Sequence, residues 1–312
     1  MKKFITGLLL FFLFAFILPW AAIFILPSDP DGYLKAYGMK KELASGPSDG
    51  RILIAGGSNA AFAVNSRMIQ DSLGLDVVNT SLHAGLGFDF IVREALEDSR
   101  PGDIVLLSMG LFTGAGGGVG ETTSIPFLVD YYPEKFADLS PGNMGIVIKG
   151  TYVLLKTKIK DLLVHKSKSG WDYRCSGFNS YGDEEAHWTA PSAGHIEPQT
   201  ITVSPDDRKR ERCFDRVCAM ISQIEAKGCQ VWILPPVLQE ETYEKSRDAA
   251  VFLEKEYARH GIYYLFPQSD AVFGDELLFN RPEHANGKGV ALYTRRLIRA
   301  LSTACCRDQQ EH

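Results

Sequence analysis

The sequence predicts an α/β protein: a three-layer α/β/α domain with a mainly parallel sheet, preceded by one transmembrane helix. Three observations lead to this fold class. An uncharged apolar run opens the 312-residue chain, short apolar runs alternate with helical patterns over residues 51–110, and the same alternation resumes over residues 205–303. Strands that alternate with helices are typical of βαβ units and a parallel sheet.

The N-terminal run, residues 4–26, has no charged side chain. It is long enough to cross a hydrocarbon core of about 30 Å. Lys2 and Lys3 precede it, and Asp29 and Asp31 follow it. By the positive-inside rule, we expect a single-pass protein of the inner or plasma membrane, with its N-terminus cytoplasmic and its domain periplasmic. A cleaved signal peptide is the alternative, although the run exceeds a usual signal core and no clear A-x-A site follows.

The first half of the domain reads as βαβαβ. Each strand is a short apolar run, and each helix has an apolar face and ends near a glycine or a turn. The expected strands are 51–56, 76–82 and 103–110, and the expected helices are 59–74 and 88–99.

The second half continues the pattern after a long interruption. The expected order is helix 205–228, strand 229–236, helix 241–261, strand 262–267 and a last helix at about 287–303. The complete order favours a flavodoxin-like, doubly wound sheet.

These elements divide the chain into parts. We expect an anchor at 1–27, a linker at 28–50, one α/β domain from 51–112 and 205–303, an insertion at 113–204 and a tail at 304–312. The insertion contains a glycine tract at 114–120, an amphipathic helix at 144–166 and an aromatic segment. That helix either packs on its own domain or lies on the membrane surface.

Composition argues against several classes of partner. The net charge is −5, and no stripe of basic residues alternates with aromatics, so nucleic acid is not an expected partner. The six cysteines form no C-x-x-C pair, which leaves structural or free thiols and at most one disulfide. His187 lies near acidic residues 183–185 but lacks a second set of ligands, so we expect neither a metal nor another cofactor.

Ser58 follows the first strand in the stretch GGSNAAF. The stretch lacks the second glycine of a dinucleotide fingerprint and the lysine of a phosphate-binding loop. A nucleophilic serine at the carboxyl end of strand one would lie at the topological switch point, where such sheets place their sites. The alternative is that Ser58 only caps the following helix.

His284 lies in a polar loop just before the last helix. That position can bring it over the carboxyl edge of the sheet to Ser58. A neutral imidazole there could take the hydroxyl proton and later return it, as in a serine hydrolase.

At these residues the chain resembles the SGNH (GDSL-like) hydrolases. AGGSNAAF is similar to their first block, VNTSLHAGLG (78–87) to their second, and RPEHANGKG (281–289) to their last. The resemblance covers roughly residues 51–110 and 205–303 and is closest to membrane-anchored members that accompany bacterial cell-surface polysaccharide synthesis. GFNSYGDEEAH (177–187) is similar to a stretch in that subgroup.

The resemblance implies roles for particular residues. Ser58 would be the nucleophile and its amide an oxyanion donor, His284 the base, and Gly85 a second oxyanion donor, with Ala84 as the neighbouring alternative. His83 would contact substrate or serve the structure.

Three positions depart from the family pattern. Phe112 stands where the family has an oxyanion asparagine, which Asn59 could replace, and Ala285 stands where it has a leucine. The family's acid lies three or four residues before the histidine, where this chain has Arg281 and Asn280, so Asn280 or a backbone carbonyl would orient the ring of His284, unless Asp270 or Asp275 does so. With a neutral partner for His284, we expect activity to rise with pH, with its midpoint at about 6.5, the ordinary histidine pKa.

The resemblance implies an O-acyl, usually acetyl, esterase or acyltransferase that acts on a cell-surface or exported polysaccharide. Its partners would be a glycan or acylated small molecule, the membrane and a polysaccharide synthesis complex. The departures keep a second hypothesis open: a catalytically degenerate domain that binds glycan or scaffolds such a complex.

Overall fold

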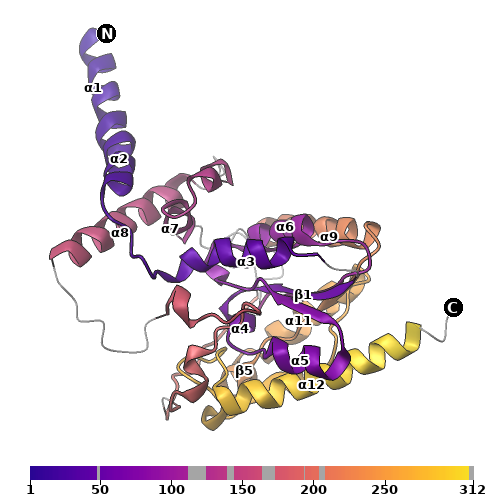
Figure 1. The fold of residues 1–312 in the computed structure, drawn as a ribbon. Helices are drawn as coiled ribbons and strands as arrows, with labels where there is room; N and C mark the ends of the chain where they lie inside the picture. Colours follow the sequence, from indigo (N-terminus) through magenta and orange to yellow (C-terminus); the bar gives the residue numbers. More distant parts are fainter. Residues whose placement is uncertain are drawn as a thin grey trace. The chain divides into compact units, whose positions relative to one another are not determined.

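The computed structural model describes residues 1–47, 50–111, 124–138, 144–163, 173–192, 194–203 and 208–308 (Figure 1). The chain forms two compact units: residues 1–35 with 121–175, hereafter the anchor unit, and residues 36–120 with 176–312, hereafter the α/β unit. These boundaries differ from the expected ones, because the 113–204 insertion contributes to both units. The glycine tract and Phe112 lie outside the described residues.

The α/β unit is built on a four-stranded parallel sheet. Its strands are β1 (Arg51–Gly56), β2 (Asp76–Asn79), β3 (Ile104–Ser108) and β4 (Gln230–Ile233), in the order β2-β1-β3-β4. The strand expected at 262–267 is reduced to one parallel bridge between Ile233 and Tyr264. The sheet therefore confirms the parallel α/β class.

Helices pack on both faces of this sheet. Leu53 and Val105 face a core shared with α6 (Phe88–Asp98), α9 (Arg208–Ala226) and α11 (Arg247–Arg259). Ile52 and Leu106 point the other way, into a core shared with α5 (Ser66–Leu73) and α12 (Gly287–Asp308). The alternation of inward directions along each strand explains why consecutive residues of β1 are all buried.

Two expected helices are each divided. Residues 59–74 form α4 (Ser58–Ala61) and α5, because Asn65 starts a new helix by accepting a hydrogen bond from the Met68 amide at 3.0 Å. Gly74 ends α5 in the left-handed region, at φ 68°. Residues 241–261 form α10 (Glu240–Lys245) and α11, which meet at Ser246.

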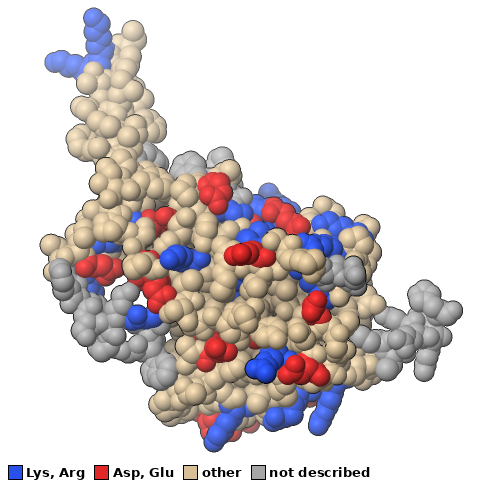
Figure 2. All heavy atoms as spheres, viewed as in Figure 1, with Lys and Arg blue, Asp and Glu red and all other residues tan. Residues whose placement is uncertain are grey.

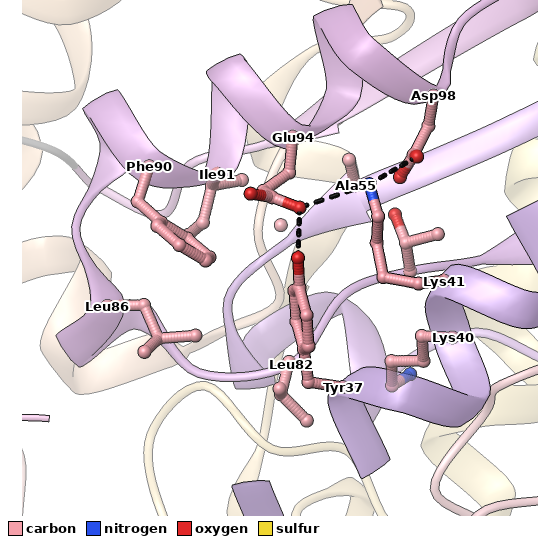
Figure 3. A pocket seen from close by; sticks show the side chains of 12 residues that line it. Tyr37, Lys40, Lys41, Ala55, Leu82, Leu86, Phe90, Ile91, Glu94 and Asp98 are labelled. Atoms are coloured by element: carbon pink, nitrogen blue, oxygen red, sulfur yellow. Dashed lines mark hydrogen bonds and ion pairs between the residues drawn. The ribbon is translucent and has the colours of Figure 1, made fainter. Parts of the chain in front are cut away.

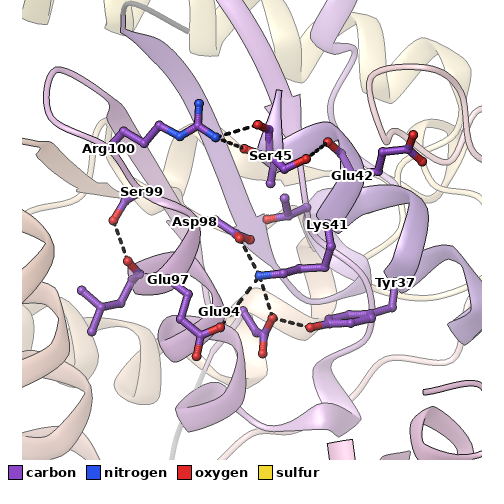
Figure 4. Close-up of polar contacts among 12 residues, drawn as sticks. Tyr37, Lys41, Glu42, Ser45, Glu94, Glu97, Asp98, Ser99 and Arg100 are labelled. Carbon is purple, nitrogen blue, oxygen red and sulfur yellow. Dashed lines mark hydrogen bonds and ion pairs between the residues drawn. The ribbon is translucent and has the colours of Figure 1, made fainter. Parts of the chain in front are cut away.

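A helix occupies part of the expected linker: α3 (Ala36–Ser45) belongs to the α/β unit. Lys41 joins it to α6 through Glu94 at 3.1 Å and Asp98 at 2.5 Å (Figure 4). At its C-terminal end, Arg51 donates to Ala44 O and Arg100 donates to Ser45 O. Such contacts satisfy carbonyls that a helix end leaves without partners.

The anchor unit contains the apolar N-terminal helix. The segment Lys2–Ile25 is helical throughout, as α1 (Lys2–Phe12), the π-helical η1 (Leu13–Ile17) and α2 (Leu18–Ile25), and is long and apolar enough to cross a membrane. Figure 2 shows this helix without charged side chains along its length and with basic side chains at its tip. The unit also contains α7 (Ile125–Val129) and α8 (Met144–Leu163).

Short elements complete the described chain. They are η2 (Tyr33–Lys35), η3 (Ala84–Leu86), η5 (Pro133–Asp138), η7 (Cys175–Gly177), η8 (Ala186–Thr189), η9 (Gln268–Ala271) and η10 (Asp275–Leu277), and the parallel pair β5 (Leu238–Gln239) and β6 (Val272–Phe273).

Candidate active site

Ser58 lies at the carboxyl end of β1, as the first residue of α4. Gly57 makes the sharp turn between strand and helix. A Cβ at Gly57 would lie 2.9 Å from the Ala84 Cβ, so only glycine lets the loop after β2 approach this closely. The turn therefore places Ser58 beside the loop that carries His83, Ala84 and Gly85.

The structure brings Ser58 and His284 together. His284 Nε2 lies 3.0 Å from Ser58 Oγ, and His284 Nδ1 lies 3.1 Å from the side-chain oxygen of Asn280. The Asn280 oxygen can only accept, so Nδ1 carries the hydrogen and Nε2 offers its lone pair to the serine hydroxyl. This is the tautomer that a general base needs.

His284 is fixed in a buried position. It is 2% exposed, and its ring stacks on Phe62 with centroids 4.3 Å apart and planes 11° apart. Burial lowers the pKa of His284 to about 3, with smaller contributions from the neighbouring Arg281, His187 and His83. The pH midpoint of activity that was expected near the ordinary histidine pKa is therefore wrong, because burial disfavours the charged form of the imidazole.

The ring of a second histidine, His187, also packs against Phe62. The ring centroid of His187 is 4.7 Å from that of Phe62, and its Nε2 lies 2.8 Å from the carbonyl oxygen of Ala285. Its Nδ1 bonds Glu184, and both side chains are buried. A carbonyl only accepts, so His187 Nε2 donates to Ala285.

Within the α/β unit, Asp183 attaches the segment that carries this pair to α5 and β2. Asp183 is fully buried and accepts hydrogen bonds from the Ser66 amide and hydroxyl, both at 2.7 Å, and from Asn79 Nδ2 at 2.9 Å. Gly182 has φ 90°, and a Cβ there would lie 2.1 Å from Asn79 O. Residues 182–187, hereafter the 182–187 segment, are thus held in place, with His187 against Phe62.

The expected oxyanion groups lie in different arrangements. The Gly85 amide donates to His83 Nδ1 at 2.8 Å, so that N–H is occupied within the loop. Asn59 is buried, and its Nδ2 donates to Ser108 Oγ at 2.6 Å, which turns the side chain toward β3. The Ser58 amide lies in the first turn of α4, where helix amides have no intrahelical acceptor.

One alternative acid for His284, Asp275, bonds other groups. Asp275 accepts from Gln239 Nε2 at 2.7 Å and from the Ile196 amide at 3.2 Å. The group at hydrogen-bond distance from Nδ1 is the Asn280 oxygen, at 3.1 Å, so Asn280 orients the ring in this structure.

Sequence reasoning missed three contributors to this site: Phe62, Glu184 and Arg281. Phe62 gave no signal beyond being apolar, although it stacks between two histidines. Glu184 and His187 are three residues apart, a spacing that places them on one side of a turn. Arg281 stands where the family pattern has an acid; burial is the main cause of the lowered pKa values of His83 and His284, and the charge of Arg281 lowers both further.

A pocket in the α/β unit lies between α3, α6 and the end of β1 (Figure 3). One wall is apolar and includes Leu82, Leu86 and Phe90, and the other carries the Lys41 cluster with Tyr37. Burial raises the pKa of Asp98 despite its bond to Lys41. Ser58 and His284 are not among its lining residues, so we assign this cluster to the joining of α3 and α6.

The described part of the chain was also searched for metal ligands and reactive thiols. It contains no group of three histidine, cysteine or acidic side chains that could hold a metal ion. Cys175, Cys213, Cys218 and Cys229 are free thiols, whereas the side chains of the last two cysteines are not described. Burial raises the pKa of Cys213 and of Cys218 to about 12, so both thiols stay protonated.

Comparisons with models of protein families, with curated proteins and with solved structures found no match.

Proposed function

We propose that the protein is an SGNH-like serine esterase or acyltransferase, with Ser58 as nucleophile and His284 as general base. The observation that carries this proposal is the 3.0 Å separation of His284 Nε2 and Ser58 Oγ, with Nδ1 held by Asn280. A base must come within hydrogen-bond reach of the proton that it removes, and this one does. The strand order and the Ile233–Tyr264 bridge also agree with a flavodoxin-like sheet.

The reaction would follow two steps. Ser58 Oγ attacks the acyl carbonyl while its proton passes to His284 Nε2, and the departing alcohol then takes that proton. A water molecule or an acceptor hydroxyl next attacks the acyl-serine, loses its proton to Nε2 and releases Ser58. Asn280 keeps the ring in the correct tautomer but adds no charge to stabilise an imidazolium.

The substrate class follows from the resemblance and the anchor. We infer an O-acyl group, most simply acetyl, on a cell-surface or exported polysaccharide. The apolar helix would hold the α/β unit at a plasma membrane, on the periplasmic side by the charges that flank the helix.

Covalent labelling tests the nucleophile. A fluorophosphonate should label the wild-type protein, and Ser58→Ala should abolish the label. Ser192→Ala is a matched control, because Ser192 is also partly buried, and its hydroxyl donates to the backbone carbonyl of Asp275 and accepts from the backbone amide of Gly194. Equal labelling of wild type and Ser58→Ala would remove Ser58 as nucleophile.

A second candidate function is glycan binding or scaffolding without turnover. It is favoured by the Gly85 amide, which is bound to His83 instead of being open to an oxyanion. In that case wild type would resist the fluorophosphonate and hydrolyse no acetyl ester, while an acetylated polysaccharide would still protect it against thermal unfolding.

A further inference from the structure

The anchor unit contains a surface that the proposed ester chemistry does not use: the exposed side of α8. Val147, Thr151, Leu154 and Lys158 form its buried side. Tyr152, Val153 and Ile159 lie on the opposite side and Leu162 lies next to the buried side, and all four are 43–46% exposed. Lys149, Lys156 and Lys160 are exposed among them. Exposed aliphatic and aromatic side chains flanked by polar groups mark an interaction surface.

The contacts of α8 with the N-terminal helix fix its depth. Lys158 Nζ donates to Ile23 O at 2.7 Å and to Leu26 O at 3.0 Å, where that helix ends. Tyr152 Oη donates at 3.4 Å to Ala15 O, about the middle of the apolar run. The N-terminal half of α8 therefore lies level with the interior of the run, and its C-terminal half lies level with the end.

The charge pattern of α8 follows the same gradient. Residues 144–155 include one lysine, Lys149, whereas residues 156–163 include three lysines and one aspartate. Lys156 and Lys160 are exposed, and Lys158 is buried in an ion pair with Asp130. Apolar residues at depth and lysines at the boundary are the distribution that a bilayer interface selects.

We propose that α8 is an interfacial helix that inserts obliquely into the outer part of the bilayer beside the anchor, with Lys156 and Lys160 at anionic lipid headgroups. Its occupant is thus the lipid of the membrane that the anchor crosses. The proposal depends on the anchor spanning a membrane and is independent of the chemistry at Ser58. It gives the anchor unit two lipid contacts in place of one.

Photo-crosslinking from the full-length chain tests this surface. A benzophenone amino acid replaces Val153, Leu162, Leu9 or Val251, one at a time, in vesicles of phosphatidylethanolamine and phosphatidylglycerol. Leu9 lies in the anchor helix, and Val251 is the matched control at 41% exposure in the α/β unit. After irradiation, mass spectrometry should find the mass shift of a phospholipid at positions 9, 153 and 162 and not at 251.

Other outcomes overturn the proposal in distinguishable ways. A lipid adduct at Leu9 alone leaves the anchor standing and removes α8 from the bilayer. No adduct at Leu9 removes the anchor and the α8 surface together. A protein adduct at Val153 or Leu162 in native membranes would assign the surface to a protein partner. Charge reversal, Lys156→Glu with Lys160→Glu, should lower the adduct yield at Leu162 and leave that at Leu9, and an unchanged yield would contradict the headgroup contact.

Discussion

At the scale of single residues, the burial of His284 determines how the proposed enzyme responds to pH. The neutral imidazole is the active form, and its pKa is lowered to about 3, so this form persists over the whole neutral range. The rate of fluorophosphonate labelling should therefore be flat from about pH 5 to 8 as far as this group controls it, and should fall only as pH drops toward the lowered pKa. A labelling rate that falls to half near pH 6.5 would contradict the lowered pKa of His284.

The same shift affects stability, with a definite sign. Between its folded pKa of about 3 and its ordinary value, His284 binds more protons in the unfolded chain than in the folded one. Its contribution to the free energy of unfolding therefore falls as pH falls, by at most about 1.4 kcal/mol per pH unit. His284→Gln should lose less stability than wild type between pH 7 and 4.5 in urea titrations, and parallel losses would contradict the shift.

Asn280 sets the strength of the base. Asn280→Asp would place a carboxylate about where the amide oxygen now lies, 3.1 Å from Nδ1. A carboxylate stabilises the imidazolium, and its loss from a serine-protease triad costs about 10⁴ in rate, so a gain of at least about tenfold is expected. Initial rates on p-nitrophenyl acetate measure it.

Two further variants complete that test. Asn280→Leu should slow the reaction, because the ring loses its orienting acceptor, whereas Asp270→Asn should leave it unchanged. A large loss in Asp270→Asn would show that a distant acid, and not Asn280, serves His284.

The sequence could predict the residues that carry a chemical signature. Ser58, His284 and Asn280 lie where blocks of sequence placed them. The roles of Gly85 and Asn59 could not be predicted, because a hydrogen bond of one amide to His83 or to Ser108 depends on side-chain rotamers that no spacing encodes. Phe62 was equally hidden, since stacking depends on tertiary packing.

At the scale of elements, Asp183 attaches the 182–187 segment to α5 and β2. Asp183→Ala would leave the amide and hydroxyl of Ser66 and the amide of Asn79 without their acceptor in a buried place. Unsatisfied buried donors cost about 1–3 kcal/mol each, so with three such donors a loss of at least about 3 kcal/mol in the free energy of unfolding is expected. Chemical denaturation measures this loss. The neighbouring exposed Glu185→Ala should change it by less than about 0.5 kcal/mol.

The bounds of some elements could be predicted from local sequence patterns and those of others could not. Strands β1 and β3 were predicted closely, since apolar runs between turns are a strong signal. The break between α4 and α5 was not, because an apolar stretch at 62–64 resembles a helix face as well as a buried crossing. Helix α3 was missed because its attachment depends on ion pairs with residues more than fifty positions away.

At the scale of the whole molecule, the chain folds as two compact units. Lys158 and Asp130 form a buried ion pair in the anchor unit, at 5% and 4% side-chain exposure. Asp130→Ala would leave a buried charge without its partner, at a cost of about 3–5 kcal/mol. Limited proteolysis of the detergent-solubilised protein should then cut the anchor unit sooner. Fluorophosphonate labelling of Ser58 should stay at the wild-type level, and a parallel loss of label would show that the two units depend on each other.

The hydroxyl that Tyr152 donates to Ala15 has a consequence for biosynthesis. Pro19 has no amide hydrogen for the carbonyl four residues before it, which is that of Ala15. Its donor from α8 lies 137 residues later in the chain. A ribosome that adds about 5–20 residues per second reaches that tyrosine roughly 7–27 s after Ala15. The contact can therefore form only when a much later part of the nascent chain arrives, and a helix that crosses a membrane would be synthesised well before its carbonyl meets this donor.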